Sequence, residues 1–152
     1  MISVMFVCHG NICRSPMAEF VLKDMVRHIG VQDEFYIESS ATSREEIGND
    51  MYPPAKKLLR QKGVPFSPRA ARQFKKEDYS RFDYIFIMER YNFVNLCRII
   101  GDDPDGRVHL FTEYTDLPKD IADPWYSGDF ETTYKQVVEC SKAFLNHLGY
   151  EA

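Results

Sequence analysis

Residues 2–16, ISVMFVCHGNICRSP, combine an apolar run, a polar loop and the start of a segment that opens with proline. The run from Ile2 to Val7 is rich in strand-forming residues, which predicts a strand buried on both faces. Ser15 and Pro16 fit the start of a helix, because a capping hydroxyl precedes a proline and apolar residues then recur at helical spacing until Gly30. The sequence therefore begins with a predicted strand, loop and helix.

The loop between this strand and this helix has the features of an anion-binding loop. Backbone N–H groups that leave a strand and enter a helix can converge on one point, where the helix N-terminus adds partial positive charge. Gly10 permits close backbone approach and unusual dihedral angles, and Asn11 tolerates the left-handed region. Arg14 supplies a planar, permanently charged fork that can bond two phosphoryl oxygens. We therefore expect a phosphate to bind here.

Cys8 stands at the end of the predicted strand, where the loop begins. Taken alone, a buried cysteine at a strand end is usually a small apolar residue. The thiolate is the nucleophilic form of cysteine, however, and helix N-termini and cationic groups favour it. Ser15 can donate a hydrogen bond to that thiolate and help it leave in a second step, or it can serve only as the helix cap. Cys8 and Arg14 together predict a nucleophile beside a phosphate site.

The rest of the chain alternates between predicted strands and helices. Strands are expected at residues 35–41, 83–88 and 108–111, helices at 53–63, 75–81, 91–100 and 130–148, and polar loops at 42–52 and 112–128. Because each parallel crossover needs a returning helix, this alternation predicts an α/β fold with a four-stranded parallel, doubly wound sheet and helices on both faces. Ligands of such sheets bind beyond the carboxyl ends of the strands, where the predicted phosphate loop lies after the first strand.

Length and composition restrict the class of protein. The chain has 152 residues, 44% of them hydrophobic, and a formal net charge of −4, with lysines and arginines scattered among carboxylates. We therefore expect residues 1–152 to form a single domain that is a monomer or weak dimer and binds no nucleic acid. The apolar start from Met1 to Val7 is too short for a membrane span and lacks a basic leader, so we expect a cytoplasmic protein without membrane association.

The four cysteines are expected to be reduced thiols. A chain of this size with a large apolar fraction needs no disulfide, and nothing in it indicates an oxidising compartment. Cys8 and Cys13 lack the close spacing of paired zinc ligands, and Cys97 and Cys140 stand alone. We therefore expect no structural zinc.

The run from Cys8 to Pro16 resembles the signature of the low-molecular-weight protein tyrosine phosphatases. Further segments resemble that family in the same order, namely Ser39 to Ser43, Ala71 to Gln73, Phe82 to Ile85, Asp123 to Tyr126 and Asp129 to Thr132. The resemblance covers nearly the whole chain. It implies a phosphatase that acts on tyrosine-phosphorylated proteins or peptides through a cysteinyl-phosphate intermediate and needs no cofactor.

The resemblance implies a role for each residue of the site. Cys8 is the nucleophile, Arg14 clamps the phosphate and Asp123 is the general acid and then the general base. One carboxyl group can serve both steps, because expulsion of a phenolate needs a proton and attack of water needs a base. Without the resemblance, Asp123 would be interpreted as a turn residue. The phosphate-binding residues are then His9, Gly10, Asn11, Ile12, Cys13 and Arg14, which neutralise the phosphoryl charge without a metal.

The resemblance also implies the surroundings of the site. Trp125 and Tyr126 would form one wall of a cleft and stack on the phenyl group of the substrate, although packing of their loop would also explain them. Ser15 and Ser39 would support the site. Cys13 would close a reversible disulfide with Cys8 under peroxide, or would only pack in the loop.

Three residues depart from the family pattern. Glu45, beside Arg44 and Glu46, stands where many members carry an aromatic residue on the opposite wall, which predicts a more polar substrate cleft that selects different peptides. Arg69 stands where a histidine commonly braces the phosphate loop, so support must come from Arg69 or from elsewhere. His9 is unusual after the nucleophile. As a cation it would favour the thiolate of Cys8, or it would simply face solvent.

Other functions compete with this interpretation. Arsenate reductases resemble the same fold and loop but need two further cysteines close together, whereas Cys97 and Cys140 are widely separated. Protein-arginine phosphatases typically carry threonine where Ile12 stands, and an apolar side chain favours a phenyl phosphate over a guanidinium phosphate. A non-catalytic phosphate-binding or thiol redox-sensing module is the alternative of another class. The presence of Asp123 with Cys8 argues against it, since pure binding needs neither an acid nor a thiolate.

Overall fold

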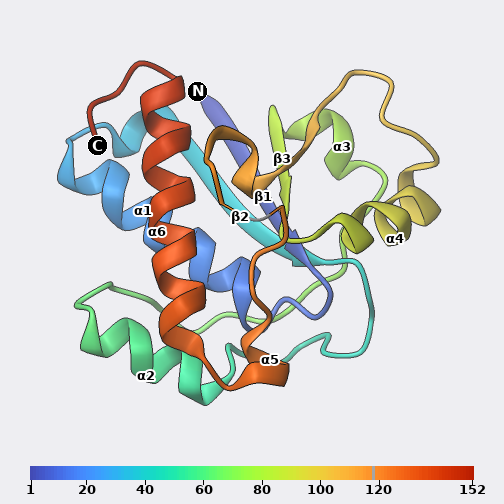
Figure 1. Cartoon of the computed structure of the whole chain (residues 1–152). Helices are drawn as coiled ribbons and strands as arrows, with labels where there is room; N and C mark the ends of the chain where they lie inside the picture. Colours follow the sequence, from blue (N-terminus) through green and yellow to red (C-terminus); the bar gives the residue numbers. More distant parts are fainter. Residues whose placement is uncertain (118) are drawn as a thin grey trace.

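The computed structural model describes residues 1–117 and 119–152, and four strands within these residues form one parallel sheet (Figure 1). The strands are β1 (Ile2–Cys8), β2 (Phe35–Ala41), β3 (Tyr84–Ile87) and β4 (Val108–Leu110), in the order β2-β1-β3-β4. β1 pairs with β2 from Ile2 opposite Phe35 to Cys8 opposite Ala41. The predicted four-stranded parallel sheet is confirmed, and β1 ends at the predicted nucleophile.

Helices connect the strands and complete the fold. They are α1 (Arg14–His28), α2 (Pro53–Gln61), α3 (Asp78–Arg81), α4 (Arg90–Ile100), α5 (Pro124–Ser127) and α6 (Phe130–His147), with short 3₁₀ segments η1 (Gln32–Glu34) and η2 (Phe111–Tyr114). Every predicted helix is present, although α3 is shorter than the predicted segment 75–81. In the described part of the chain, no helix is both long and apolar enough to cross a membrane.

The prediction of one continuous loop over residues 112–128 was wrong. This segment contains the end of η2 and all of α5. Asp123 caps α5, because its Oδ1 accepts a hydrogen bond of 3.1 Å from the Trp125 N–H, and Pro124 occupies the first turn. A helix of four residues is too short to leave a periodic apolar pattern, and its start signal, Asp123 before Pro124, is equally typical of a turn.

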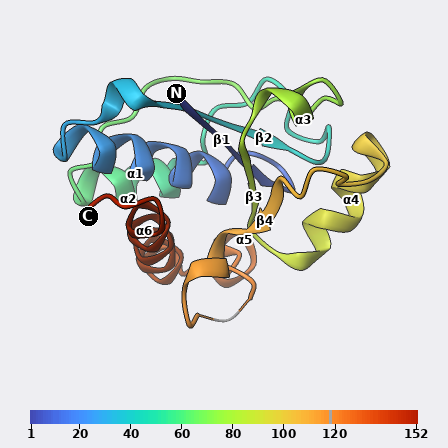
Figure 2. The same ribbon diagram turned by 90° about the horizontal axis from the view of Figure 1, so that it is seen from above.

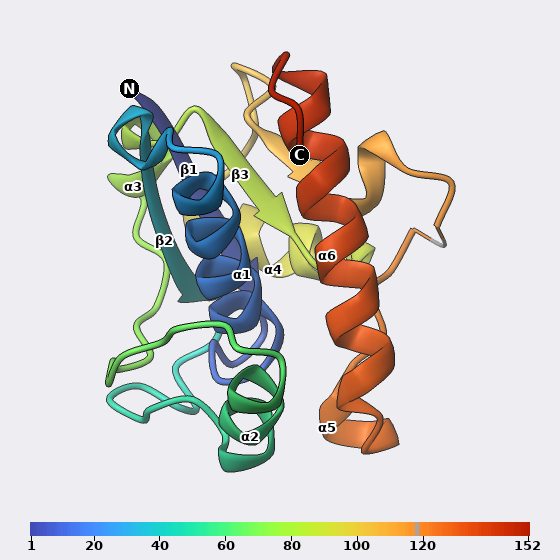
Figure 3. The same cartoon turned by 90° about the vertical axis from the view of Figure 1, so that its left-hand side faces the viewer.

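Different helices cover the two faces of the sheet. Val4 and Phe6 of β1 belong to a core shared with α1 and α6, whereas Met5 and Val7 belong to a core shared with Leu96 of α4. This division follows from the alternation of side chains along a strand. Figures 2 and 3 show α1 and α6 side by side on one face. The predicted doubly wound arrangement is therefore confirmed.

Aromatic rings fill the core between the sheet and α6. The ring centroid of Phe86 in β3 lies 5.8 Å from that of Phe6 in β1. It lies 5.1 Å from the centroid of Phe111 and 4.8 Å from that of Phe144 in α6. Such tilted and edge-to-face pairs stabilise a core beyond the effect of the buried area alone. This core fixes the two strands whose carboxyl ends carry the candidate active site.

Replacing Phe86 with alanine should remove this packing and leave a cavity. Phe86 is fully buried, so we expect Phe86→Ala to lower the free energy of unfolding by about 4 kcal/mol. Urea denaturation followed by circular dichroism measures this change. Phe93→Ala, a change of the same size at a partly exposed site on α4, should stay within roughly 1 kcal/mol of wild type. Equal losses in the two variants would contradict this description of the core.

Candidate active site

The loop between β1 and α1 takes its shape from Asn11. Asn11 has a φ of 59°, and within residues 1–117 and 119–152 it is the one non-glycine residue with a positive φ. Asparagine tolerates this left-handed region because its short polar side chain bonds locally. Gly10, whose lack of a side chain would permit such a conformation, is absent from the described glycines with positive φ. The unusual backbone conformation belongs to the residue that follows it.

Cys8 lies on the floor of this loop with its sulfur surrounded by hydrogen-bond donors. The side chain is 4% exposed. The Asn11 N–H donates to Cys8 Sγ at 3.3 Å, and Ser15 Oγ lies 3.0 Å from the same atom. Asn11 Nδ2 also donates to Ser15 Oγ at 2.7 Å. The sulfur therefore lies within hydrogen-bond distance of one backbone N–H and one hydroxyl group.

Ser15 belongs to the first turn of α1 and does not cap it. The helix begins at Arg14, and its N-cap residue, Cys13, makes no side-chain capping bond. The Ser15 hydroxyl is buried and lies between Cys8 Sγ and the carbonyl oxygen of Ser40, which is 3.4 Å away. Its proton can therefore go to Ser40 when Cys8 is a thiol and to the sulfur when Cys8 is a thiolate. The alternative of a purely capping role was wrong.

Arg14 is buried and held by three groups at the carboxyl edge of the sheet. One terminal nitrogen donates to the carbonyl oxygen of Ile121 at 3.1 Å. The other lies 3.3 Å from Glu89 Oε1 and 3.4 Å from Asp123 Oδ2. Burial disfavours the charge, but the nearby Cys8 sulfur and the two carboxylates together raise the pKa of Arg14 above its ordinary value. The guanidinium is thus a permanent cation in a fixed orientation.

Glu89 is a site residue that the sequence analysis missed. It is the N-cap of α4 and forms a capping box with Asn92, which fixes its position. The signal was its place directly after the predicted strand 83–88, since carboxyl ends of parallel strands meet at one edge of the sheet. The structure brings it to Arg14 across 75 positions of sequence.

Asp123 combines a structural and a chemical position. One carboxylate oxygen accepts from the Trp125 N–H at 3.1 Å as the cap of α5. The other lies 3.4 Å from Arg14 and faces the cleft. The cap fixes the carboxylate above the loop, so the structure brings together the three residues predicted to be catalytic.

A cleft of about 240 Å³ opens above the loop. Trp125 and Tyr126 line one side and are 52% and 87% exposed, and the Trp125 ring lies 4.8 Å from that of Tyr52. Tyr126 is far too exposed to be explained by packing of its loop. The full lining consists of Cys8, His9, Gly10, Asn11, Ile12, Cys13, Arg14, Glu45, Glu46, Asp123, Trp125 and Tyr126.

The lining contains the predicted phosphate-binding and cleft residues and adds Glu46. His9 and Glu45 form an exposed pair, with His9 Nε2 3.0 Å from Glu45 Oε2. His9 therefore contacts the opposite loop as well as facing solvent. Ile12 is only 9% exposed and packs with Tyr52 and Phe130, so little of its apolar surface is available to a substrate.

Arg69 braces the phosphate loop from behind. Its guanidinium donates to Oδ1 of Asn11 and, at 3.4 Å, to the carbonyl oxygen of Asn49. The Arg72 N–H also approaches Asn11 Oδ1, at 3.4 Å. The arginine found in place of the expected histidine therefore supports the loop directly.

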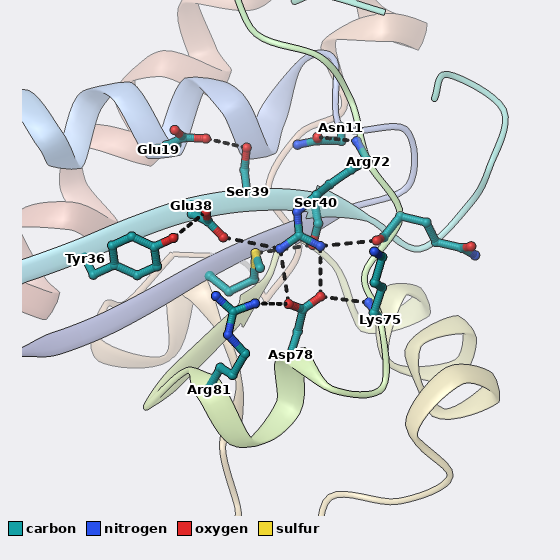
Figure 4. A network of polar contacts seen from close by, with 12 residues as sticks. Asn11, Glu19, Tyr36, Glu38, Ser39, Ser40, Arg72, Lys75, Asp78 and Arg81 are labelled. Carbon is teal, nitrogen blue, oxygen red and sulfur yellow. Dashed lines mark hydrogen bonds and ion pairs between the residues drawn. The ribbon is translucent and has the colours of Figure 1, made fainter. Parts of the chain in front are cut away.

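Arg72 is itself held by the carboxylates of Asp78 in α3 and Glu38 in β2 (Figure 4). Its terminal nitrogens lie 2.8 and 3.2 Å from the two carboxylate oxygens of Asp78, and one lies 3.3 Å from Glu38. Asp78 is buried, and although burial opposes its charge, the bonds from Arg72 and the Lys75 N–H keep its pKa below the usual value.

Ser39, which was expected to support the site, makes a different contact, because its hydroxyl donates to Glu19 Oε1 at 2.6 Å. This contact joins Ser39 to α1, and the supporting role of Ser39 stays a prediction.

The remaining cysteines differ from Cys8. Burial, followed by the proximity of Cys8 and Asp123, raises the pKa of Cys13 to about 12, so Cys13 is a neutral thiol. Cys97 and Cys140 lie in α4 and α6, which cover opposite faces of the sheet, and cannot form a disulfide with each other in this fold. The pair of neighbouring cysteines that an arsenate reductase needs is not formed by these two residues.

A parallel α/β sheet with a cysteine at the end of its first strand, an arginine at the start of the next helix and a carboxylate above them is typical of cysteine-dependent phosphatases. Residues 3–152 match the family described as low molecular weight phosphotyrosine protein phosphatase. The human low molecular weight phosphotyrosine protein phosphatase is 40% identical over 149 residues, which cover 94% of this chain and 93% of the human protein. The chain belongs to the low-molecular-weight phosphotyrosine protein phosphatase family.

Solved structures agree with this assignment. The crystal structure of YfkJ from Bacillus subtilis is similar with a TM-score of 0.92 and 33% identity, covering 98% of this chain and 95% of YfkJ. The crystal structure of DARP, a Drosophila arginine phosphatase, is similar with a TM-score of 0.87 and 30% identity, covering 98% of this chain and 99% of DARP.

Removing the brace from Asn11 should reduce activity. Arg69→Met would leave the buried Asn11 amide oxygen without its charged donor and loosen the loop, so we expect kcat/KM for an aryl phosphate to fall about tenfold, or about 1.4 kcal/mol. Steady-state kinetics measures this fall. Arg60→Met, at an exposed position on α2, is the matched control and should keep wild-type kinetics. Wild-type kinetics in Arg69→Met would contradict the bracing role.

Proposed function

We propose that the chain hydrolyses phosphotyrosine with Cys8 as nucleophile, Arg14 as phosphate clamp and Asp123 as general acid and base. The proposal rests on the position of Cys8 Sγ, the Arg14 guanidinium and the Asp123 carboxyl group around one cleft. In the first step the thiolate attacks phosphorus, the bond from phosphorus to the phenolic oxygen breaks, and Asp123 gives its proton to the leaving tyrosine.

In the second step water attacks the cysteinyl phosphate. Asp123, now ionised, takes a proton from the water, the phosphorus–sulfur bond breaks, and inorganic phosphate leaves. The departing sulfur regains its negative charge. The Ser15 hydroxyl at 3.0 Å and the Asn11 N–H at 3.3 Å support this step, since both can donate to the anion.

Arg14 would hold the phosphoryl oxygens throughout. Its fork matches the planar face that three equatorial oxygens present in the transition state, and the backbone amides of residues 9–14 add further donors. Its contacts with Glu89 and the carbonyl of Ile121 support a fixed orientation before the substrate arrives. Such preorganisation lowers the barrier because no reorientation is needed during reaction.

We infer that the substrates are tyrosine-phosphorylated proteins or peptides whose phenyl ring lies against Trp125 and Tyr126. Both rings are exposed in the lining of the cleft and offer flat apolar faces. The four free cysteines support a location in the reducing cytoplasm. The scattered basic residues argue against a nucleic-acid partner. We further propose a single-domain protein that is a monomer or weak dimer and has no membrane partner.

We propose that Cys13 protects Cys8 from irreversible oxidation. Peroxide would convert the Cys8 and Cys13 thiols to one disulfide and two waters, and a thiol reductant would reverse the reaction. The buried and neutral Cys13 is poorly suited to attack phosphorus itself.

Phosphoarginine hydrolysis is the second candidate, because the Drosophila arginine phosphatase has a similar structure. The relatives named phosphotyrosine protein phosphatases, such as the human protein at 40% identity, favour phosphotyrosine. The aromatic wall does not separate the two candidates, because aromatic faces accept a phenyl ring and a guanidinium group alike. The buried position of Ile12 weakens the argument that this residue alone selects a phenyl phosphate. A panel of phosphotyrosine, phosphoarginine and phosphoserine peptides, with vanadate as inhibitor, distinguishes the candidates.

Replacing the nucleophile should abolish turnover but not phosphate binding. We expect Cys8→Ser to reduce hydrolysis of p-nitrophenyl phosphate in the presence of chelator by on the order of 10⁴-fold or more. Trp125 is the single tryptophan of the chain and lines the cleft, so its fluorescence should still report binding of phosphate or vanadate. Cys97→Ser, outside the cleft, should keep wild-type turnover. Inactive wild-type enzyme, or an active Cys8→Ser variant, would contradict the proposal.

Replacing the acid should affect substrates according to their leaving groups. Asparagine caps helices as well as aspartate, so Asp123→Asn should keep α5 and remove only the proton. We expect kcat/KM to fall about 100-fold for phenyl phosphate and only a few-fold for p-nitrophenyl phosphate, whose leaving group needs little protonation. Asp129→Asn, at the cap of α6, is the control with the same chemical change. Equal losses for the two substrates would remove Asp123 from the acid role.

A further inference from the structure

The cleft that would bind a phosphate dianion has a negatively charged rim. Its lining contains the carboxylates of Glu45, Glu46 and Asp123. Among the described residues of that lining, Arg14 is the one permanent cation, and it lies buried on the floor in contact with Asp123. Arg44, next to Glu45, is exposed but does not belong to the lining, so the lining itself carries an excess of negative charge that the binding of phosphate alone does not explain.

Both rim glutamates are held in place beside the phosphate loop. Glu45 Oε2 contacts His9 Nε2 at 3.0 Å, and Glu46 Oε2 accepts from Asn49 Nδ2 at 2.6 Å. The Glu46 side chain also lies over Gly10, because its Cγ is 3.5 Å from the place where a β-carbon on Gly10 would stand. Each glutamate uses one oxygen for its contact, so the other can accept a bond from a ligand.

The opposite side of the cleft also suits a cation. The Trp125 and Tyr126 rings are exposed, and aromatic faces attract guanidinium and ammonium groups. A phosphotyrosine that reaches the floor would leave its neighbouring peptide residues at the mouth, between these rings and the two glutamates. Lysine and arginine have the length to extend over the rim and the charge to bind both sides.

We propose that Glu45 and Glu46 are specificity-determining residues that select phosphotyrosine flanked by lysine or arginine. This inference rests on the proposed phosphotyrosine phosphatase function and adds a substrate class to it. The positive flanks offset the repulsion between the rim and the incoming phosphate dianion. Acidic flanks add to that repulsion, so the same carboxylates favour one class of peptide and reject the other.

The test compares two phosphotyrosyl peptides of equal length, one with lysine and arginine and one with aspartate and glutamate around the phosphotyrosine. At low ionic strength, wild type should have a kcat/KM about tenfold higher for the basic peptide, since each exposed contact contributes roughly two- to fivefold. In the double variant with Glu45→Gln and Glu46→Gln, each side chain keeps an oxygen that can accept a hydrogen bond but loses its charge, so the preference should fall to about twofold or less. Glu77→Gln, an exposed glutamate outside the cleft, should keep the wild-type preference.

Two results would overturn the inference. One is a wild-type preference at or below one while p-nitrophenyl phosphate and both peptides are hydrolysed, which leaves the proposed function intact. The other is a preference that is the same in the double variant as in wild type, which would assign the selection to other residues. Failure of the proposed function gives a different result, in which wild type hydrolyses neither peptide nor p-nitrophenyl phosphate, and both proposals then fall.

Discussion

The site depends on the left-handed backbone of Asn11. With a φ of 59°, its N–H is directed at Cys8 Sγ, while its side chain bonds Ser15 in front and Arg69 behind. A left-handed conformation costs a non-glycine residue roughly 1–2 kcal/mol, which the bonds at both ends of the buried amide offset. Cys8, Ser15 and Arg69 therefore all contact Asn11, which makes this residue the common support of the loop.

The local part of this arrangement could be predicted from the sequence, and the long-range part could not. β1, the loop and α1 follow one another, so apolar runs, loop residues and helix spacing indicated all three. The contact of Arg14 with Glu89 joins residues 75 positions apart, and that of Arg69 with Asn11 joins residues 58 apart. Such contacts depend on how β3 and the segment after α2 fold onto the site, which spacing along the chain does not encode. Asp123 was assigned by family resemblance and not by any local pattern.

Charge is distributed in two layers around the cleft. Inside, Arg14 lies among two carboxylates and the Cys8 sulfur, and these groups keep it protonated and oriented. At the rim, Glu45 and Glu46 present negative charge to solvent beside exposed aromatic rings. The inner layer suits chemistry on any aryl phosphate, whereas the outer layer distinguishes one peptide from another. The two layers touch, since Glu45 contacts His9 and Glu46 lies over Gly10 of the phosphate loop.

In the proposed mechanism the phosphoryl group passes through Cys8. Rapid mixing of the enzyme with a phosphotyrosyl peptide, a denaturing quench within one turnover, and mass spectrometry of the proteolytic fragments test this step. We expect a transient phosphoryl group on Cys8, which appears before free phosphate and disappears with its release. Free phosphate formed at full rate with no phosphorylated Cys8, or with the group on Cys13 or another residue, would contradict it.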